Sequence, residues 1–277
     1  MKHILFTKEL LLLVVALFVM IATSCIKEDL DQCYTLKLKV ENIKGDDITE
    51  YGWMESTDLY IIRRESELLG ETFAWIRTLS VPAMSIVLDG YTADRSLRIV
   101  AWGNVNALGE KQSVSEAQTI EDLKVMLKSQ DGLAVTPDSL YYGSEQVLTK
   151  AGGVAKETEI VIRPKVGTVT IETRGLQEQL GRMGLRSSAD CDFYLNNTLS
   201  GFDYRGTQIG DSVYYNPEGA WNESGVEWIT PTMQTACPGQ DMAVSISANG
   251  VSLGSAKVER TVIPIYTSAG ENTHLDP

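Results

Sequence analysis

The chain has 277 residues, of which 43% are hydrophobic and 22% are charged. This length suits one large domain or two ordinary ones, and the composition predicts a buried core rather than wholesale disorder. The formal net charge of −13 argues against nucleic acid as a partner, because an acidic surface repels a phosphate backbone. Only two histidines occur, His3 and His274, which disfavours histidine-based metal sites and catalytic triads.

The N-terminus has the features of a bacterial secretion signal. After Lys2, an unbroken apolar run extends from Leu10 to Ala22 and is shorter than the ~20 residues that a membrane-spanning helix requires. Small residues and then Cys25 follow, an arrangement that resembles a lipobox with Ala22 in the position usually held by leucine. We therefore expect residues 1–24 to be a lipoprotein signal peptide and Cys25 to carry the acyl chains.

The residues after Cys25 suggest where the lipoprotein is sent. Lys27, Glu28 and Asp29 resemble the Lys-acidic-acidic export signal that directs Bacteroidetes-type lipoproteins to the outer leaflet of the outer membrane. Each buried acyl CH₂ contributes about 0.8 kcal/mol, so several chains hold a protein durably. Residues 25–33 are accordingly predicted to be a lipidated tether, with the rest of the chain exposed at the cell surface. An uncleaved signal anchor is the alternative.

Three cysteines remain besides Cys25, namely Cys33, Cys191 and Cys237. The cell envelope permits disulfide bonds, and Cys191 and Cys237 are a candidate pair because they lie in the same half of the chain. Three buried thiols are the alternative, since cysteine often serves as a small apolar residue. No Cys-x-x-Cys motif or Cys/His cluster predicts a metal site, and no cofactor is expected.

Alternating apolar and polar residues predict a β-rich N-terminal domain over residues 34–165. Strands are expected at residues 34–40, 59–62, 73–76, 85–88, 97–102, 140–142 and 158–162. In the run that ends at Trp102, this side chain lies on the face opposite Leu97 and Ile99, so it is expected to pack under a loop or against the partner domain. Ser115 and Gln118 match a capping box before apolar residues at helical spacing, which predicts one short helix up to Lys128.

A second β-rich domain is predicted over residues 166–277. Pro164 follows one strand, and a new alternating strand begins at residue 166 with Val169 and Ile171 facing inward. Further strands are expected at residues 191–195, 212–215, 242–248, 251–257 and 262–266. This spacing is typical of β-sandwiches, and a direct strand-to-strand junction predicts a rod-like pair of domains with little hinge freedom.

Four segments carry a resemblance to a known family. They are residues Ser24–Leu30 together with Cys33, then Leu97–Asn104, Leu140–Gly143 and Arg163–Ile171. Together they resemble the FimB-type fimbrillin-associated anchor family of Bacteroidetes. The resemblance implies an all-β protein of two tandem transthyretin-like, Greek-key β-sandwich domains without enzymatic activity.

The same resemblance implies a role at the base of a fimbrium. The protein would be a lipid-bound subunit that attaches fimbrial stalk or accessory subunits to the outer membrane and limits fibre length. The joint would form by strand exchange, in which an added strand completes an open sheet edge. No alternating tail follows Tyr266 that could serve as a donor strand, which fits a terminal subunit or a truncated chain.

Two further patterns are candidates for modification or binding. Asp-Ser-apolar sequences at Ser139 and Ser212 resemble the O-glycosylation acceptor of Bacteroidetes envelope proteins, although Asp-Ser is also ordinary turn chemistry. Trp221 and Trp228 lie in a region rich in Gly, Asn and Glu, where exposed aromatic rings would bind sugars. A surface glycan-binding lipoprotein is therefore the alternative function. No motif typical of an enzyme occurs, and Asp47 belongs to a predicted solvated turn rather than a calcium loop.

Overall fold

The computed structural model describes residues 34–66, 70–80, 85–88, 96–105, 111–148, 157–185, 191–230, 233–235, 242–256 and 272–275. The signal peptide, Cys25 and the export residues Lys27, Glu28 and Asp29 lie outside these ranges. So do Cys33, Cys237 and the strand expected at residues 262–266. What the sequence predicts for all of them stays a prediction.

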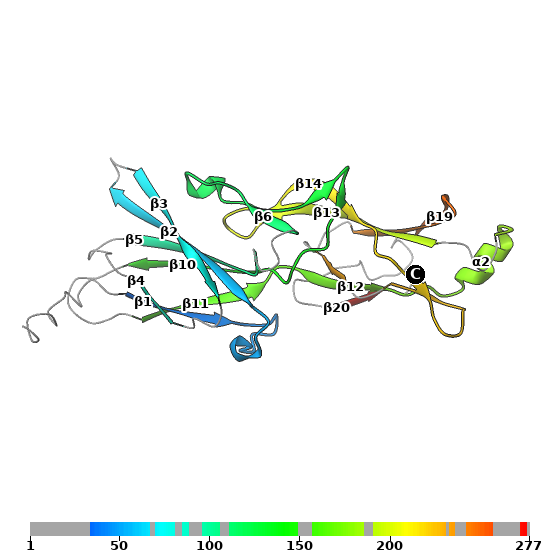
Figure 1. Cartoon of the computed structure of the whole chain (residues 1–277), viewed down its shortest axis with the longest axis horizontal. Coiled ribbons are helices and arrows are strands. Elements are labelled where there is room, and N and C mark those ends of the chain that lie inside the picture. Colours follow the sequence, from blue (N-terminus) through cyan, green and yellow to red (C-terminus); the bar gives the residue numbers. More distant parts are fainter. Residues whose placement is uncertain are drawn as a thin grey trace, which may run out of the picture.

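The first part of the chain forms one seven-stranded sheet that folds over on itself. Its strands, in the order in which they pair, are β3 (Gly70–Ser80), β2 (Ser56–Ser66), β5 (Ser96–Gly103), β10 (Tyr141–Leu148), β11 (Glu157–Pro164), β1 (Tyr34–Val40) and β4 (Ser85–Leu88). β10 and β11 pair through Tyr141 and Tyr142 at one end alone, so β11, β1 and β4 leave to form a second layer (Figure 1). Gly143 permits the close crossing, because a Cβ there would clash with the carbonyl oxygen of Val161.

The apolar residues on the inner faces of these two layers form a closed core. Pleated strands point successive side chains to opposite faces, so alternate residues meet between the layers. The buried set comprises Leu36, Leu38, Val40, Ile48, Met54, Leu59, Ile61, Leu97, Ile99, Ala101, Tyr141, Val147, Ile160 and Ile162. The residues between them on β2 and β5, such as Tyr60, Val100 and Trp102, point the other way and belong to a second core.

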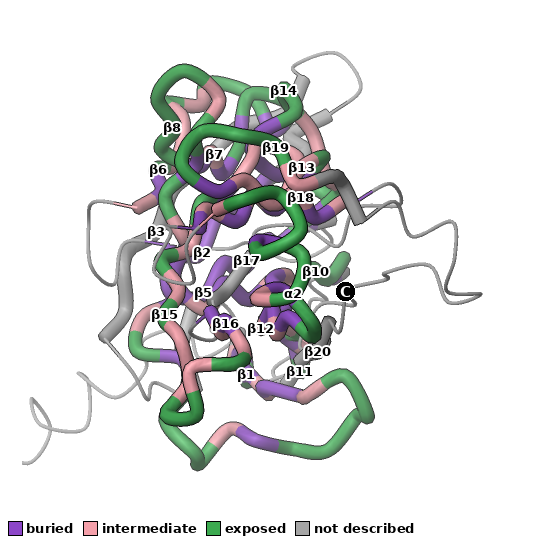
Figure 2. Tube along the Cα trace, turned by 90° about the vertical axis from the view of Figure 1, so that its right-hand side faces the viewer, coloured by how far each residue is buried: buried purple, intermediate pink, exposed green. Residues whose placement is uncertain are grey.

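That second core lies between two sheets formed mainly by the second half of the chain. The larger sheet has the order β19 (Val251–Ala256), β18 (Ala243–Ala248), β13 (Cys191–Phe202), β14 (Gln208–Tyr215), β9 (Leu133–Ala134) and β8 (Ser129–Gln130). The smaller has β17 (Met233–Thr235), β12 (Gly167–Ile171) and β20 (Asn272–Leu275), while β15 (Ala220–Trp221) pairs with β16 (Trp228–Ile229). Seen end-on, buried segments of both sheets face one another (Figure 2).

Residues 111–134 differ from the sequence prediction. In place of the helix expected up to Lys128, a 3-10 turn covers Ile120–Asp122, and it is followed by strand β7 (Val125–Leu127). The capping box is formed by Thr119 and Asp122 rather than by Ser115 and Gln118. β7 pairs with both β6 (Gln112–Val114) and β13, so its apolar residues are buried with a period of two. Sheet pairing with a distant strand has outweighed a local helical spacing.

The α-helix of the described chain lies elsewhere. Helix α2 spans Leu176–Arg182, and it buries Leu176 and Leu180, which are one turn apart. Gly175 and Gly184, both at positive φ, lie on either side of it. The prediction of a helical insertion in the first domain is therefore wrong, whereas the predominantly β architecture is confirmed.

The predicted strands agree well with the observed ones. Each strand expected within the described residues overlaps an observed strand, and Val169 and Ile171 of β12 are fully buried as expected. The division of the chain at residues 165 and 166 stays a prediction. The pairing shows in addition that β7 and β9, which precede this division, pair with β13 and β14, which follow it.

Candidate functional site

The first described strand, which follows the predicted tether in sequence, is paired on both sides. β1 pairs in parallel with β11 from Thr35 to Val40 and antiparallel with β4 from Tyr34 to Lys37. Its residues Leu36, Leu38 and Val40 are buried, as the sequence predicts. A pull on the segment before Tyr34 would therefore load two hydrogen-bonded ladders along the strand direction, and many bonds would have to break together.

Aromatic side chains join the two parts of the molecule. Trp102 of β5 is fully buried, and its ring centroid lies 4.9 Å from that of Tyr142 and 5.7 Å from that of Phe202 on β13. The Tyr142 hydroxyl donates a hydrogen bond of 3.0 Å to the carbonyl oxygen of Tyr204. Trp102 thus faces the partner part of the chain, which is one of the two positions that the sequence predicts.

Lys165, which lies between β11 and β12, packs beside this junction. The Lys165 ammonium lies 5.1 Å from the centroid of the Tyr142 ring, and burial lowers the pKa of Lys165. The Lys165 backbone N–H donates to the carbonyl oxygen of Leu140. The core that contains Trp102 and Phe202, together with the Tyr142–Tyr204 hydrogen bond, holds the two parts end to end along the long axis (Figure 1).

A buried polar network supports the same region. Gln112 Nε2 donates to Asp138 Oδ2 at 2.9 Å and to the carbonyl oxygen of Val105 at 2.8 Å. Lys111 Nζ forms an ion pair of 2.9 Å with Asp138 Oδ1. Because buried polar groups are costly unless they are paired, this network fixes the position of residue 138 beside β6.

The two candidate glycosylation sites differ in access. Ser139 is half-buried, and its preceding residue Asp138 is occupied by the network just described. Ser212 and Asp211 are exposed on β14. Attachment of a glycan requires an accessible hydroxyl, so the geometry favours Ser212 over Ser139, and both stay predictions.

Intact-mass measurement of the protein from its native cells tests this ranking. We expect mass increments of hexose that disappear in Ser212→Ala and persist in Ser139→Ala. The exposed Ser113, which follows a glutamine, provides a matched control: Ser113→Ala should leave the increments unchanged. A native protein without any added sugar mass would remove the idea for both serines.

The proposed tryptophan platform does not form as the sequence suggests. Trp228 is 9% exposed, and its ring stacks on Phe193 with the centroids 6.2 Å apart. Trp221 meets it edge-on at 5.3 Å and is itself half-buried. Since Trp228 is buried, these two rings do not offer an open pair of stacking surfaces; this geometry does not favour glycan binding at Trp221 and Trp228, which stays a prediction.

The structure describes only one of the two cysteines of the predicted disulfide. Cys191 is buried at the start of β13, opposite Ala248 of β18, while Cys237 lies outside the described residues. The disulfide therefore stays a prediction. Within the described ranges, no group of three or more His, Cys, Asp or Glu side chains could hold a metal ion. In the same ranges, no helix is long and apolar enough to cross a membrane.

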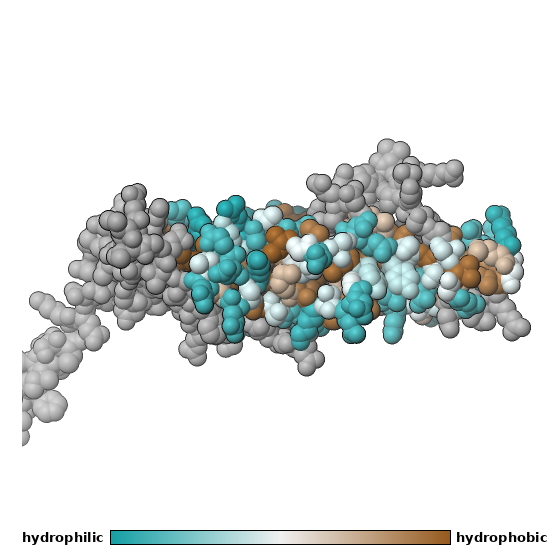
Figure 3. All heavy atoms as spheres, turned by 90° about the horizontal axis from the view of Figure 1, so that it is seen from above, coloured by the Kyte–Doolittle hydropathy of each residue, from teal (hydrophilic) through white to brown (hydrophobic). Residues whose placement is uncertain are grey.

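One surface feature is not predicted by any pattern in the sequence. The loop between β1 and β2, residues 41–55, exposes Tyr51 at 70% and Trp53 at 61%. No period or motif identifies these residues, because a loop has no repeating pattern of inward and outward side chains. On the face that Figure 3 shows, hydrophilic and hydrophobic described residues are interspersed.

Comparison with known proteins identifies relatives of the whole folded region. The family model of fimbrillin-A associated anchor proteins Mfa1 and Mfa2 matches residues 30–274. The major fimbrium anchoring subunit FimB of Porphyromonas gingivalis is 26% identical over 216 residues, which cover 76% of this chain and 68% of that protein.

Solved structures share the fold. A crystal structure of a candidate adhesin from Bacteroides ovatus superposes with a TM-score of 0.68 at 13% identity, covering 88% of each chain. The fimbrial anchor protein Mfa2 of Porphyromonas gingivalis gives a TM-score of 0.60 at 14% identity, covering 87% of this chain and 90% of that one. At such identities, the likeness shows the fold alone.

Proposed function

Because the chain belongs to the family of fimbrillin-A associated anchor proteins Mfa1 and Mfa2, we propose that it is the lipid-anchored base subunit of a fimbrium. Acyl chains on Cys25 hold it in the outer membrane, and Lys27, Glu28 and Asp29 direct it to the cell surface. Its role is structural rather than catalytic. Its two parts are tandem transthyretin-like sandwiches that attach the stalk and limit the length of the fibre.

The position of β1 is the observation that carries this proposal. An anchor must transmit force from a flexible tether to a folded body without unravelling. β1 lies between β11 and β4, so a pull along this strand would act on two hydrogen-bonded ladders rather than on one. The continuous core around Trp102 then passes the load into the second part of the chain.

Strand exchange would join this subunit to the stalk. The strands at the ends of a sheet carry backbone N–H and C=O groups on their outer side, and these accept a further strand. In the described sheets, β3 and β4 end the first sheet, β19 and β8 end the larger second sheet, and β17 and β20 end the small one. β19 begins at Val251, which is 47% exposed, and Figure 1 shows β19 toward the opposite end of the long axis from β1.

Removal of the protein from its native cells tests the proposal. We expect fibres to appear in the culture medium, unattached and altered in length, because nothing then holds their base. Complementation with the wild-type chain should restore attachment. A photo-reactive residue at Val251 should cross-link to a fimbrial subunit, whereas one at the half-buried Ser139 should not. Fibres that remain on cells lacking the protein would contradict the anchor role.

A further inference from the structure

The loop between β1 and β2 has a defined conformation. The Asn42 side-chain oxygen accepts hydrogen bonds from the backbone N–H groups of Lys44 and Asp46, at 2.8 and 2.9 Å. Asp47 Oδ1 accepts from the Thr49 hydroxyl at 2.6 Å, and the Thr49 hydroxyl oxygen in turn accepts from the Val40 backbone N–H at 2.9 Å. These bonds tie the loop to the end of β1.

Buried contacts fix the second half of the same loop. Ile48 and Met54 are 9% and 6% exposed and belong to the first core. Asn104, which is buried at a φ of 60°, donates through Nδ2 to the carbonyl oxygens of Trp53 and Ser139, each at 2.9 Å. Its Oδ1 accepts from the Glu55 backbone N–H at 2.6 Å. The backbone around Trp53 is thus clamped from both sides.

The largest side chains of this ordered loop nevertheless face solvent. Tyr51 is 70% exposed, Trp53 is 61% exposed and Ile43 is 40% exposed. Aromatic rings held in place at low entropic cost are typical of binding surfaces, because they offer a large contact area with few rotatable bonds. This loop is fixed by hydrogen bonds and buried contacts, and it still exposes two aromatic rings. It is therefore a candidate recognition element.

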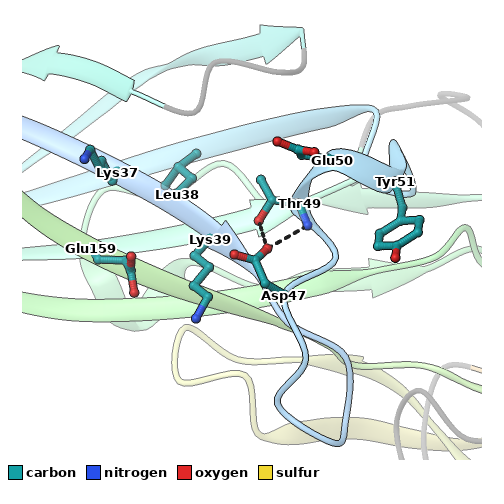
Figure 4. A pocket seen from close by; sticks show the side chains of 8 residues that line it. All are labelled: Lys37, Leu38, Lys39, Asp47, Thr49, Glu50, Tyr51 and Glu159. Atoms are coloured by element: carbon teal, nitrogen blue, oxygen red, sulfur yellow. Dashed lines mark hydrogen bonds between the residues drawn. The ribbon is translucent and has the colours of Figure 1, made fainter.

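A shallow hollow of about 770 Å³ adjoins the loop. It is lined by Lys37, Leu38 and Lys39 of β1, by Asp47, Thr49, Glu50 and Tyr51 of the loop, and by Glu159 of β11. Figure 4 shows Tyr51 at one end of this row and Glu159 toward the other, with Asp47 and Thr49 between them. The hollow is therefore a strip of hydrogen-bonding groups with an aromatic ring at one end.

The side chains that line the hollow indicate which class of ligand it suits. Ammonium and carboxylate groups occur together, so a strongly charged ligand of either sign would meet repulsion. Leu38 is only 6% exposed, so the ring of Tyr51 is the main apolar side-chain surface that the lining offers. A neutral molecule with many hydroxyl groups suits both kinds of charged group, and its C–H faces suit an exposed aromatic ring.

We propose that the strip formed by Tyr51, Thr49, Asp47, Lys37 and Glu159 binds a neutral saccharide. Trp53 does not line the hollow, but it is exposed two residues after Tyr51 on the same loop, and we include it as an extension of the site. Tyr51 stacks against the apolar face of one sugar ring, while the flanking carboxylates accept hydrogen bonds from its hydroxyl groups. Hydrogen bonds from Thr49 hold the pKa of Asp47 below its usual range, so this carboxylate is ionised and accepts hydrogen bonds at neutral pH. This site is distinct from Trp221 and Trp228.

Titration of the full, acylated protein in detergent micelles with short neutral hexose oligosaccharides tests the site, with tryptophan fluorescence and calorimetry as readouts. We expect saturable binding that is about tenfold weaker or absent in Tyr51→Ala and in Trp53→Ala. Tyr51→Phe should keep most of the affinity, since it retains the stacking ring. Tyr214→Ala, which removes a half-buried ring on β14, is the matched control and should bind as the wild type does. Far-ultraviolet circular dichroism verifies that each variant is folded.

The outcomes separate this site from the anchor role. Tyr51→Ala and Trp53→Ala cells should keep their fibres attached, because the loop follows the end of β1 opposite Tyr34. Absence of binding by the wild type across the panel would overturn the proposal, as would binding that neither alanine variant weakens. Fibre loss caused by Tyr51→Ala, without any saccharide binding, would instead make this surface a contact for a fimbrial subunit and would also overturn it.

Discussion

Cys25→Ala is expected to release the protein from the cell and its fibres with it. Without the thiol, no acyl chain can be attached, and an acidic chain, with a net charge of −13 over its full sequence, has no attraction for anionic lipid. Several acyl chains contribute far more free energy to membrane attachment than any surface contact, so the effect should be nearly complete. Incorporation of labelled palmitate and separation of cell and medium fractions measure it.

Two neighbouring variants make this experiment specific. Cys33→Ala alters another thiol on the tether and should leave attachment unchanged. Substitution of Lys27, Glu28 and Asp29 together by alanine should keep the palmitate label but hide the protein from protease added to intact cells, because sorting fails while acylation proceeds. A Cys25→Ala protein that still fractionates with membranes and still holds fibres would contradict lipid anchoring.

Trp102→Ala is expected to lower the free energy of unfolding by about 3–5 kcal/mol. The side chain is fully buried and lies against Tyr142 and Phe202, so its removal leaves a cavity at the junction of the two parts. The contacts across the junction would weaken as well. Urea unfolding, followed by fluorescence and circular dichroism, measures the loss.

A surface substitution provides the comparison for Trp102. Val226 is 48% exposed, and Val226→Ala should change the free energy of unfolding by no more than about 0.5 kcal/mol. Trp102→Phe should have an intermediate effect, because it keeps part of the ring contact. If Trp102→Ala cost less than about 1 kcal/mol, the junction would not depend on this side chain, and the proposed path of force through it would be wrong.

The strands were predictable because they follow from a local property of the backbone. In a pleated strand, side chains alternate between faces, so a buried face leaves a period of two in the sequence. Leu36, Leu38 and Val40 show it in β1, and Val169 and Ile171 show it in β12. The resemblance of short segments to an anchor family was equally accessible, and the family model matches residues 30–274.

The sequence by itself thus determined where most strands lie, which side of each strand is buried and to which family the chain belongs. Only the tertiary structure decided that Val125 and Leu127 form a strand against β13 and that Trp228 is buried. Only the tertiary structure shows that Tyr51 is exposed to solvent and lines a polar hollow. The physical reason is that alternation is set by neighbours along the chain, whereas strand partners and the exposure of a side chain depend on contacts between residues far apart in sequence.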